Sequence, residues 1–230
     1  MSVRGWAEAQ TIDGVLERMD AIDAALPAAD GVATFNRMYR QVTRFVDQAV
    51  DDGLFVAGPF IARLDVVFAN IFFEAYAADQ DGRPIPRAWA PLFEARTKPH
   101  THPVQFALAG MNAHICHDLP SAVLNTCREL AISPEDDSLE HTDFTTINSV
   151  LAEAEGQIKS WFCTGVVATV DDLGGRLDDG FAMFSIASAR AAAWEVAQLL
   201  WDLIGHEHLD RLVRANLART VAMASRGILL

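Results

Sequence analysis

Residues 99–120 read PHTHPVQFALAGMNAHICHDLP, and this stretch decides the fold of the chain. From Pro99 to His117 it holds no Asp, Glu, Lys or Arg, and no longer stretch of the sequence is free of them. It is long enough to cross a bilayer, but its prolines, amides and four histidines would be costly in hydrocarbon. We therefore expect a helix from about Val104 to His117 that is buried in the centre of a protein core.

The segments on both sides carry the same helical signal. Their apolar residues recur with the spacing i, i+3, i+4, i+7, which is typical of helices with one buried face. Thr11 is a candidate N-cap, Pro59 can begin a helix at its first turn, and the strongest break lies at 81–86. Helices are expected near residues 12–26, 35–46, 59–72, 89–93, 104–117, 120–130, 144–161, 181–201 and 209–221.

No segment shows the alternation of apolar and polar residues that is typical of a β-strand, and no hairpin turn is flanked by strands. The sequence also contains no internal repeat and no low-complexity linker. We therefore predict an all-α fold, in which a bundle of about eight helices surrounds the central uncharged helix. The economical division is a single domain over residues 1–230.

The composition excludes several classes of protein. The chain of 230 residues is 51% hydrophobic and 21% charged, which suits a protein with a core and not a disordered one. Its three cysteines are too few and too widely spaced for a disulfide scaffold. A net charge of −13 argues against nucleic acid or an anionic membrane as the main partner, since phosphate contacts need a basic surface.

The N-terminus lacks the uninterrupted apolar stretch of a signal peptide. We therefore expect a cytoplasmic protein without membrane insertion, whose partner is a small-molecule substrate or ligand. The sequence leaves the oligomeric state open.

A cluster of polar residues interrupts the uncharged helix. In an α-helix His114 and Asp118 lie about 40° apart around the axis, and His117 lies about 60° from His114. Such a face can bind a divalent metal ion such as zinc, with His114 and Asp118 as ligands. The same residues can form an acid–base site without metal, with His114 and His117 as catalytic groups. In a third interpretation the pair is structural, or Asp118 is the N-cap of the next helix.

Asp65 is a second polar residue at an apolar position. The buried face of the helix at 59–72 consists of large apolar residues, and Asp65 falls on that face. A carboxylate there must be paired, bound to a metal or protonated. Two possibilities follow. Asp65 can form an ion pair with an arginine such as Arg190 or Arg63, or it can share a site with the His–Asp pair as a metal ligand or a catalytic residue.

Other residues are candidates for contacts with the substrate. The expected substrate-binding residues are Asn112, Phe68, Phe72, Trp89, Arg190 and Trp194. Arg190 and Trp194 are four residues apart on one helix and can stack. Asn112 can instead be a buried amide that ties two helices together.

Three further residues have expected local roles. Gly110 marks a close contact between helices. Asp143 lies at an expected helix start, where its side chain or that of Thr142 can cap the helix. His141, two residues earlier, is near enough in the sequence to that start to be considered as a second base or a fourth metal ligand.

Several short motifs resemble those of an uncharacterised, mostly actinobacterial family of all-helical proteins of about this length. The most specific one is Gly-Met-Asn-Ala-His-Ile-x-x-Asp-Leu-Pro, which stands here at residues 110–120. Leu64-Asp65-Val66, Ala88-Trp89-x-x-Leu92-Phe93 and Ala192-Ala193-Trp194 match as well, so the resemblance covers most of the chain. That family carries no established activity, and the resemblance implies only that these positions are its hallmarks.

A local similarity points to the zinc-dependent phospholipase C and P1 nuclease group. Those all-α hydrolases have a helix that reads Gly-x-x-x-His-x-x-x-Asp and is soon followed by Pro, which Gly110, His114, Asp118 and Pro120 match. The similarity implies a zinc ion. The chain departs from the group because it lacks the N-terminal Trp that binds metal there, and because Ala122-Val123 stands where a further His is expected.

Three functions follow from these residues. The first is a metal-dependent hydrolase of a small molecule, with Asp65, His114 and Asp118 as ligands and His117 or His141 as base or fourth ligand. The second is a metal-free cyclase or isomerase of secondary metabolism, in which Asp65 and His114 act as acid and base. The third is a ligand-binding or interaction protein without catalysis, in which the cluster is a buried network.

Overall fold

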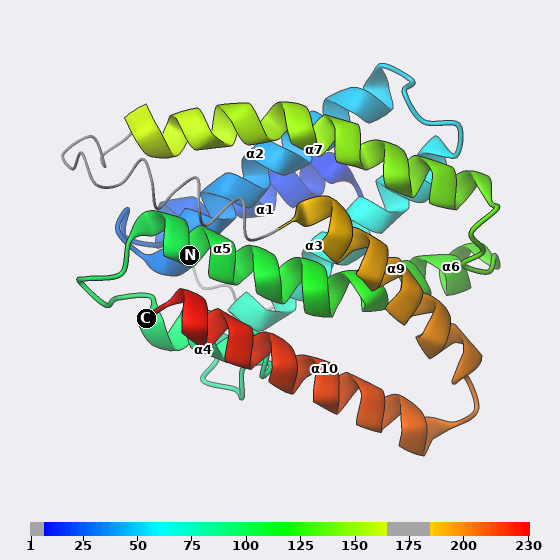
Figure 1. Ribbon diagram of the computed structural model, residues 1–230. Helices are drawn as coiled ribbons and strands as arrows, with labels where there is room; N and C mark the ends of the chain where they lie inside the picture. Colours follow the sequence, from blue (N-terminus) through cyan, green and yellow to red (C-terminus); the bar gives the residue numbers. More distant parts are fainter. Residues whose placement is uncertain (1–6, 165–184) are drawn as a thin grey trace.

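The computed structural model describes residues 7–164 and 185–230, with residues 153–164 described by their backbone alone (Figure 1). Every regular element within these residues is a helix, and they contain no strand, so the predicted all-α fold is confirmed. The elements are α1 (Ile12–Ala25), α2 (Gly31–Asp51), α3 (Gly58–Gln80), α4 (Ala90–Ala95), α5 (Pro103–Ala113), the π-helical segment η1 (His114–Asp118), α6 (Leu119–Leu130), α7 (Leu139–Thr164), α9 (Ile186–Asp202) and α10 (Glu207–Ile228).

Helix α5 lies at the centre of the bundle, as expected for the uncharged stretch (Figure 1). All its residues from Phe106 to Ala113 are buried. It packs against α2 on one side and α10 on the other. At Gly110 a methyl group would overlap the ring of Phe35 on α2, so the predicted close contact between helices is confirmed.

The ends of the helices follow the local signals in the sequence. The hydroxyl of Thr11 accepts a hydrogen bond from the backbone N–H of Gly14 at 3.1 Å and caps α1. Pro59 lies in the first turn of α3. After the end of α3, Gly82 has a φ of +65°, a conformation that glycine adopts at little cost.

Two details differ from the expectation. Helix α7 begins at Leu139, so Asp143 lies inside it. Its carboxylate accepts hydrogen bonds from the backbone N–H groups of Val56 and Ala57 and caps the start of α3 instead. The prediction that Asp143 caps its own helix was wrong, because Val56 is 87 residues away in the sequence. Helix α9 begins at Ile186, and Phe181, expected in that helix, lies outside the described residues.

The buried residues form two apolar clusters. One joins α1, α2, α3, α4 and α5 to α10. The other joins the end of α2 and the start of α3 to α6, α7 and α9. Phe68 of α3 and Ile115 of η1 pack against both clusters. His114 stacks on Phe68, and Asp65 lies one helical turn before it, so both lie at this border.

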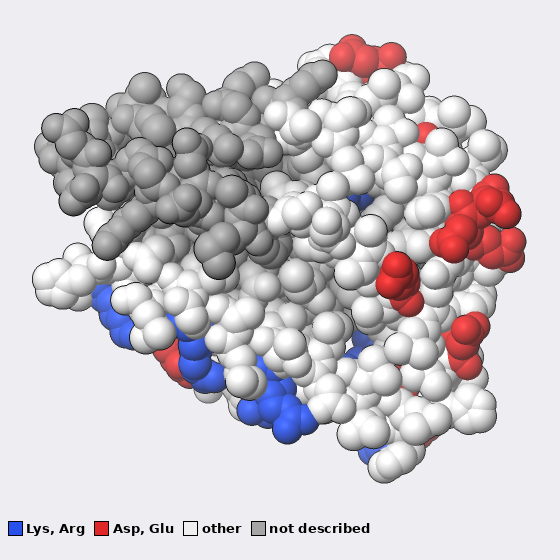
Figure 2. Space-filling view, in the orientation of Figure 1, with Lys and Arg blue, Asp and Glu red and all other residues white. Residues whose placement is uncertain are grey.

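The surface charge is unevenly distributed. In the view of Figure 2 acidic side chains gather on the side of α6 and α9, whereas basic side chains lie along α10. Among the described residues, no helix has the length and apolar character that crossing a membrane would need.

Candidate functional site

A π-helical segment joins the central helix to α6. This segment, η1, contains the whole His114–Asp118 cluster, and π-helical turns within α-helices are often found at functional sites. The Asp118 carboxylate contacts Nδ1 of His114 at 3.1 Å and Nδ1 of His117 at 2.7 Å. Asp118 makes no side-chain hydrogen bond to the backbone of α6, so the N-cap interpretation was wrong.

A third donor holds the same carboxylate. The indole Nε1–H of Trp89, just before α4, donates to Asp118 Oδ2 at 2.9 Å. Burial by itself raises the pKa of Asp118, but the hydrogen bonds from both histidines outweigh it and hold the pKa below its usual value. Because an ionised carboxylate only accepts hydrogen bonds, Nδ1 of each histidine carries the proton that it shares with Asp118.

His114 is held between Asp118 and an aromatic wall. Its side chain is 3% exposed, and its ring stacks on that of Phe68 with the centroids 3.5 Å apart. Burial lowers the pKa of His114 more than Asp118 raises it, so the imidazole is neutral at pH 7. With its proton on Nδ1, the imidazole has a free lone pair on Nε2, and this buried atom has no hydrogen-bond partner in the described structure.

Asp65 lies one helical turn before Phe68, which stacks on His114, and is buried on the face that the sequence predicted. Its Oδ2 atom has no hydrogen-bond partner among the described residues. Burial, and to a smaller extent Asp47, raise the pKa of Asp65 to about 7. Asp65 is therefore divided between its protonated and ionised forms near neutral pH.

Neither of the two expected arginines pairs with Asp65. Arg63 forms an ion pair with Glu129, with Nε and Oε2 2.6 Å apart. The guanidinium group of Arg190 donates to two uncharged acceptors instead, the Phe144 carbonyl oxygen at 2.7 Å and Asn148 Oδ1 at 3.0 Å. The ion-pair interpretation of Asp65 was wrong.

Tyr39 is a site residue that the sequence analysis missed. It comes from α2, and the edge of its ring meets the ring of His114 with the centroids 4.5 Å apart. Its buried hydroxyl group lies near the hydroxyl of Thr43, one turn further along α2, but neither forms a hydrogen bond of normal geometry in the described structure. Burial, and then the charges of Asp65 and Asp118, raise the pKa of Tyr39 well above its usual value, so the hydroxyl keeps its proton. In the sequence Tyr39 is one of the apolar positions of α2, and nothing marks it as polar in role.

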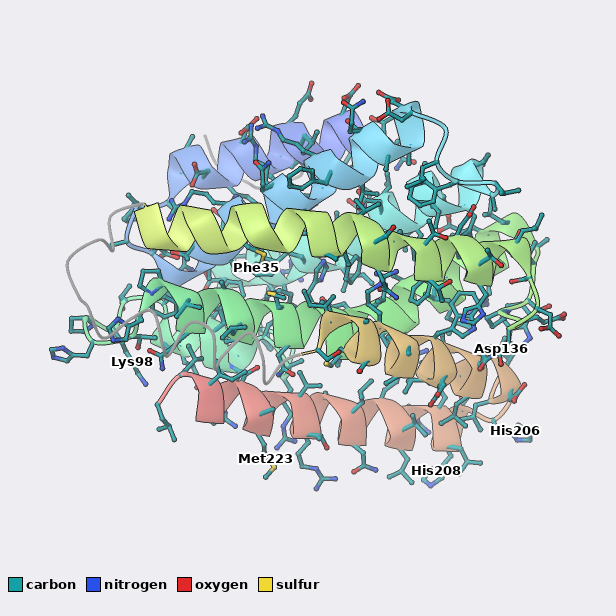
Figure 3. The ribbon with its side chains drawn as sticks, turned by 45° about the horizontal axis from the view of Figure 1, so that its top comes forward. Phe35, Lys98, Asp136, His206, His208 and Met223 are labelled. Atoms are coloured by element: carbon teal, nitrogen blue, oxygen red, sulfur yellow. The ribbon has the colours of Figure 1, made fainter. Side chains whose placement is uncertain are left out.

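Tyr39, Asp65 and His114 line one cavity of about 90 Å³ between the helices. Phe35, which is labelled in Figure 3, is part of its wall. Among the described residues, the wall is apolar except for four side chains, those of Tyr39, Asp65, His114 and Arg190. It consists of Phe35, Met38, Tyr39, Val42, Val46, Ile61, Leu64, Asp65, Phe68, Met111, His114, Ile115, Leu119, Ile147, Leu151, Ile186 and Arg190. Helices α2, α3, α5, α6, α7 and α9 and the segment η1 all contribute.

Arg190 is the cationic residue of this wall. Its guanidinium carbon lies 4.2 Å from the centroid of the Phe144 ring. The predicted stacking with Trp194 was wrong, because Trp194 packs on His141 instead, with the centroids 4.7 Å apart. Burial lowers the pKa of Arg190 to about 9, which leaves it protonated at neutral pH.

Four other expected residues are not part of the cavity wall. Asn112 donates to the carbonyl oxygen of Val221 and to the hydroxyl of Ser225 and so ties α5 to α10, the alternative that the sequence left open. Phe72 packs in the first cluster against the rings of Phe35 and Trp89. Trp89 itself donates its hydrogen bond to Asp118. Trp194 lies in the second cluster and donates to Asp136.

The other two histidines differ in their distance from the site. His117 contacts Asp118 from a more exposed position, with its side chain 23% exposed. It is not part of the cavity wall. His141 belongs to another group, because it stacks on Trp194 and its Nδ1 contacts the carbonyl oxygen of Asp136 at 2.7 Å. The structure therefore does not bring His141 to His114.

The expected metal ligands do not form a metal-binding group. Among the described side chains, those of residues 7–152 and 185–230, no three of His, Cys, Asp or Glu lie in an arrangement that could hold a metal ion. Asp118 already accepts hydrogen bonds from three donors. The role of Asp65, His114 and Asp118 as metal ligands stays a prediction.

Comparison with known proteins gives one match. The model of a protein family described as a family of unknown function (DUF5995) matches residues 12–230. The chain matches no curated protein and no solved structure.

Proposed function

Because the chain belongs to the family of unknown function DUF5995, we propose its function from the geometry of the cavity. The protein is a metal-free enzyme of the isomerase type, which moves a proton on a small molecule bound in the cavity. His114 is the base, and Asp65 and Tyr39 donate hydrogen bonds to the substrate.

One observation carries this proposal. Three buried polar atoms, Tyr39 Oη, Asp65 Oδ2 and His114 Nε2, have no hydrogen-bond partner among the described residues, and all three belong to residues that line one apolar cavity. An unsatisfied buried polar group costs about 1–3 kcal/mol. Three such groups from three helices are accounted for if a bound molecule supplies their partners.

The state of each group suits proton transfer. A neutral His114 with its proton on Nδ1 can accept a proton at Nε2. Asp118 then stabilises the imidazolium that forms, as a carboxylate does for a catalytic histidine. Asp65, with a pKa of about 7, is close to the value at which an acid or base works best at neutral pH.

The reaction that fits this set is removal of a proton next to a carbonyl group. His114 Nε2 takes the proton from carbon, and the electron pair of the C–H bond forms a C=C bond while the carbonyl π electrons move to oxygen. The Tyr39 hydroxyl and protonated Asp65 donate hydrogen bonds to that oxygen, in apolar surroundings where such donors act strongly. Return of the proton to another atom gives an isomer.

The other two functions predicted from the sequence have less support. The metal-dependent hydrolase needs Asp65, His114 and Asp118 around one ion, and the described side chains offer no such group. A binding protein without catalysis would use the same cavity and would bind a ligand without exchanging its protons. The experiment below separates this case from an enzyme.

Acetone in D₂O is a suitable first substrate. A cavity of about 150 Å³ takes up benzene, so a cavity of about 90 Å³ has room for a molecule of about four non-hydrogen atoms. We expect the protein to speed up the exchange of acetone methyl protons for deuterium, followed by ¹H NMR. His114→Gln and Asp65→Asn should lower the added rate by about 100-fold or more.

The matched control is His206→Gln, since His206 is an exposed histidine at the start of α10. This variant should exchange acetone at the parental rate. If the parent exchanges acetone no faster than buffer, or if His114→Gln is as active as the parent, the proposed enzyme is wrong.

A further inference from the structure

Arg190 has a feature that the proton-transfer site does not use. Its side chain is 6% exposed and lines the cavity, yet no described carboxylate pairs with it. Its hydrogen bonds go to a backbone carbonyl and to the amide oxygen of Asn148. A buried guanidinium without a negative partner is costly, and buried charges in proteins are usually paired.

Arg96 shows how the same chain treats a more exposed arginine. Its side chain is 14% exposed and is held by two carboxylates, Asp30 and Asp79, at 2.7 and 2.6 Å. The chain has 31 acidic residues against 18 basic ones, so acids are not scarce. The absence of a described acid at Arg190, the more deeply buried of the two, therefore needs its own explanation.

Asp65 does not supply the missing charge. Asp65 lines the same cavity, but no nitrogen of Arg190 lies within 4.0 Å of a carboxylate oxygen of Asp65, the limit for an ion pair. Its pKa is raised by burial and Asp47, whereas a close guanidinium would lower it. The cavity wall thus has a cation on α9 that is separate from the acid–base groups on α2, α3 and η1.

We propose that Arg190 binds the carboxylate of the ligand, so that the substrate of this cavity is a small carboxylic acid in its anionic form. This inference rests on the proposed function, because it assumes that the cavity is the substrate site. Two of the five N–H groups of the guanidinium are used by Phe144 and Asn148. The others suit the two parallel hydrogen bonds that arginine forms with a carboxylate.

The volume of the cavity then limits the substrate class. A cavity of about 90 Å³ has room for a carboxylic acid of about four non-hydrogen atoms, with its carboxylate at Arg190.

Acetate and acetone test this inference, because they have the same number of non-hydrogen atoms and nearly the same shape but differ in charge. Binding of each to the full-length protein is measured by ¹H–¹⁵N NMR at constant ionic strength in a chloride-free buffer, with inorganic phosphate as a second anion. We expect acetate to bind at least tenfold more tightly than acetone, and phosphate to bind no more tightly than acetone.

Variants of Arg190 then locate the effect. Arg190→Gln should remove the preference for acetate over acetone, and Arg190→Lys, which keeps the charge, should retain part of it. The control Arg63→Gln alters an arginine that pairs with Glu129 outside the cavity and should behave like the parent. The comparison of acetate with acetone in the parent needs no variant and stands even if Arg190→Gln fails to fold.

The outcomes separate the two proposals. If the parent binds acetone and acetate equally, or if Arg190→Gln keeps the preference, the carboxylate site is wrong while acetone exchange still tests the acid–base site. Equal binding of phosphate and acetate would contradict a carboxylate-specific site. If neither molecule binds and acetone is not exchanged, both proposals fall.

Discussion

At the scale of single residues, the polar atoms of the cavity are not arranged to satisfy one another. His114 and Asp118 form a hydrogen-bonded pair, yet Nε2 of His114 has no described hydrogen-bond partner. Asp65 lacks the arginine that would hold it ionised. Most buried polar groups in proteins are hydrogen-bonded, and three groups without such bonds on the wall of one cavity are expected where a ligand supplies the partners.

Asp65 makes the stability of the protein depend on pH. Its pKa is about 7 in the folded chain and about 3.9 in the unfolded one, so between these values the unfolded state has already lost its proton while the folded state still holds it. The free energy of unfolding therefore falls as pH rises from about 4 to about 7. Asp65→Asn, which mimics the protonated form, should remove this loss, which is on the order of 4 kcal/mol.

Urea denaturation of the parent and of Asp65→Asn at pH 4 and pH 8 measures this effect. The two proteins should be nearly equally stable at pH 4, and the variant should be more stable at pH 8. Asp20→Asn is the control, because Asp20 is an exposed acid in an ion pair with Arg40. A parent that is as stable at pH 8 as its Asp65→Asn variant would contradict a buried, unpaired carboxyl group.

Tyr39→Phe separates function from stability at one atom. Because the Tyr39 hydroxyl has only the Thr43 hydroxyl beside it and forms no hydrogen bond of normal geometry, its removal should change the free energy of unfolding by no more than about 1 kcal/mol. The same change removes a donor to the substrate oxygen and should slow acetone exchange by about tenfold or more. Thermal unfolding and the NMR exchange rate measure the two effects. A loss of stability with unchanged exchange would show that the hydroxyl is structural.

At the scale of helices and their ends, the sequence predicts what depends on neighbouring residues. Thr11 and Pro59 mark helix starts because capping and proline geometry act within one turn. Asp143 was misassigned because the α3 backbone it caps is distant in the sequence. The partners of Arg190 and the role of Tyr39 likewise depend on which helices pack together, which periodicity alone does not determine.

The π-helical segment shows the same limit. The spacing of His114 and Asp118 predicts that they share a face, and they do form a hydrogen bond. The regular helix assumed in that prediction does not bring Trp89 to the carboxylate, because Trp89 reaches it from another part of the chain. The sequence therefore predicted the pair and its burial, but not the third donor that fixes the carboxylate.

Gly110→Ala tests the packing between helices. The added methyl group would overlap the Phe35 ring, so α2 and α5 must move apart, at a cost of about 1–3 kcal/mol in the free energy of unfolding. Gly227→Ala is the matched control, because Gly227 lies in α10 with open space beside it and alanine favours a helix there by up to about 1 kcal/mol. Denaturant unfolding of both variants should give shifts of opposite sign. A Gly110→Ala variant with the same free energy of unfolding as the parent would show that α2 and α5 are not in tight contact there.

At the scale of the whole molecule, the cavity lies where two apolar clusters meet. Helices α2 and α3 contribute to both clusters, and Phe68 and Ile115 pack against both. A protein selected only for stability gains from filling such a space, since each buried methylene contributes about 0.8 kcal/mol. An unfilled space with polar atoms on its wall is the compromise expected where function opposes stability.

Val46→Ile tests this compromise directly, because Val46 lines the cavity and the substitution adds one methylene group to it. We expect the free energy of unfolding to rise by up to about 0.8 kcal/mol and acetone exchange to slow, since the added group takes space from the substrate. Val104→Ile makes the same change in α5 at a buried position outside the cavity wall. There the extra group meets packed neighbours and should cost about 1 kcal/mol or more without affecting exchange. If Val46→Ile raises the free energy of unfolding and slows acetone exchange, both effects come from the same cavity. If Val46→Ile and Val104→Ile have equal effects on exchange, the space is not a substrate site.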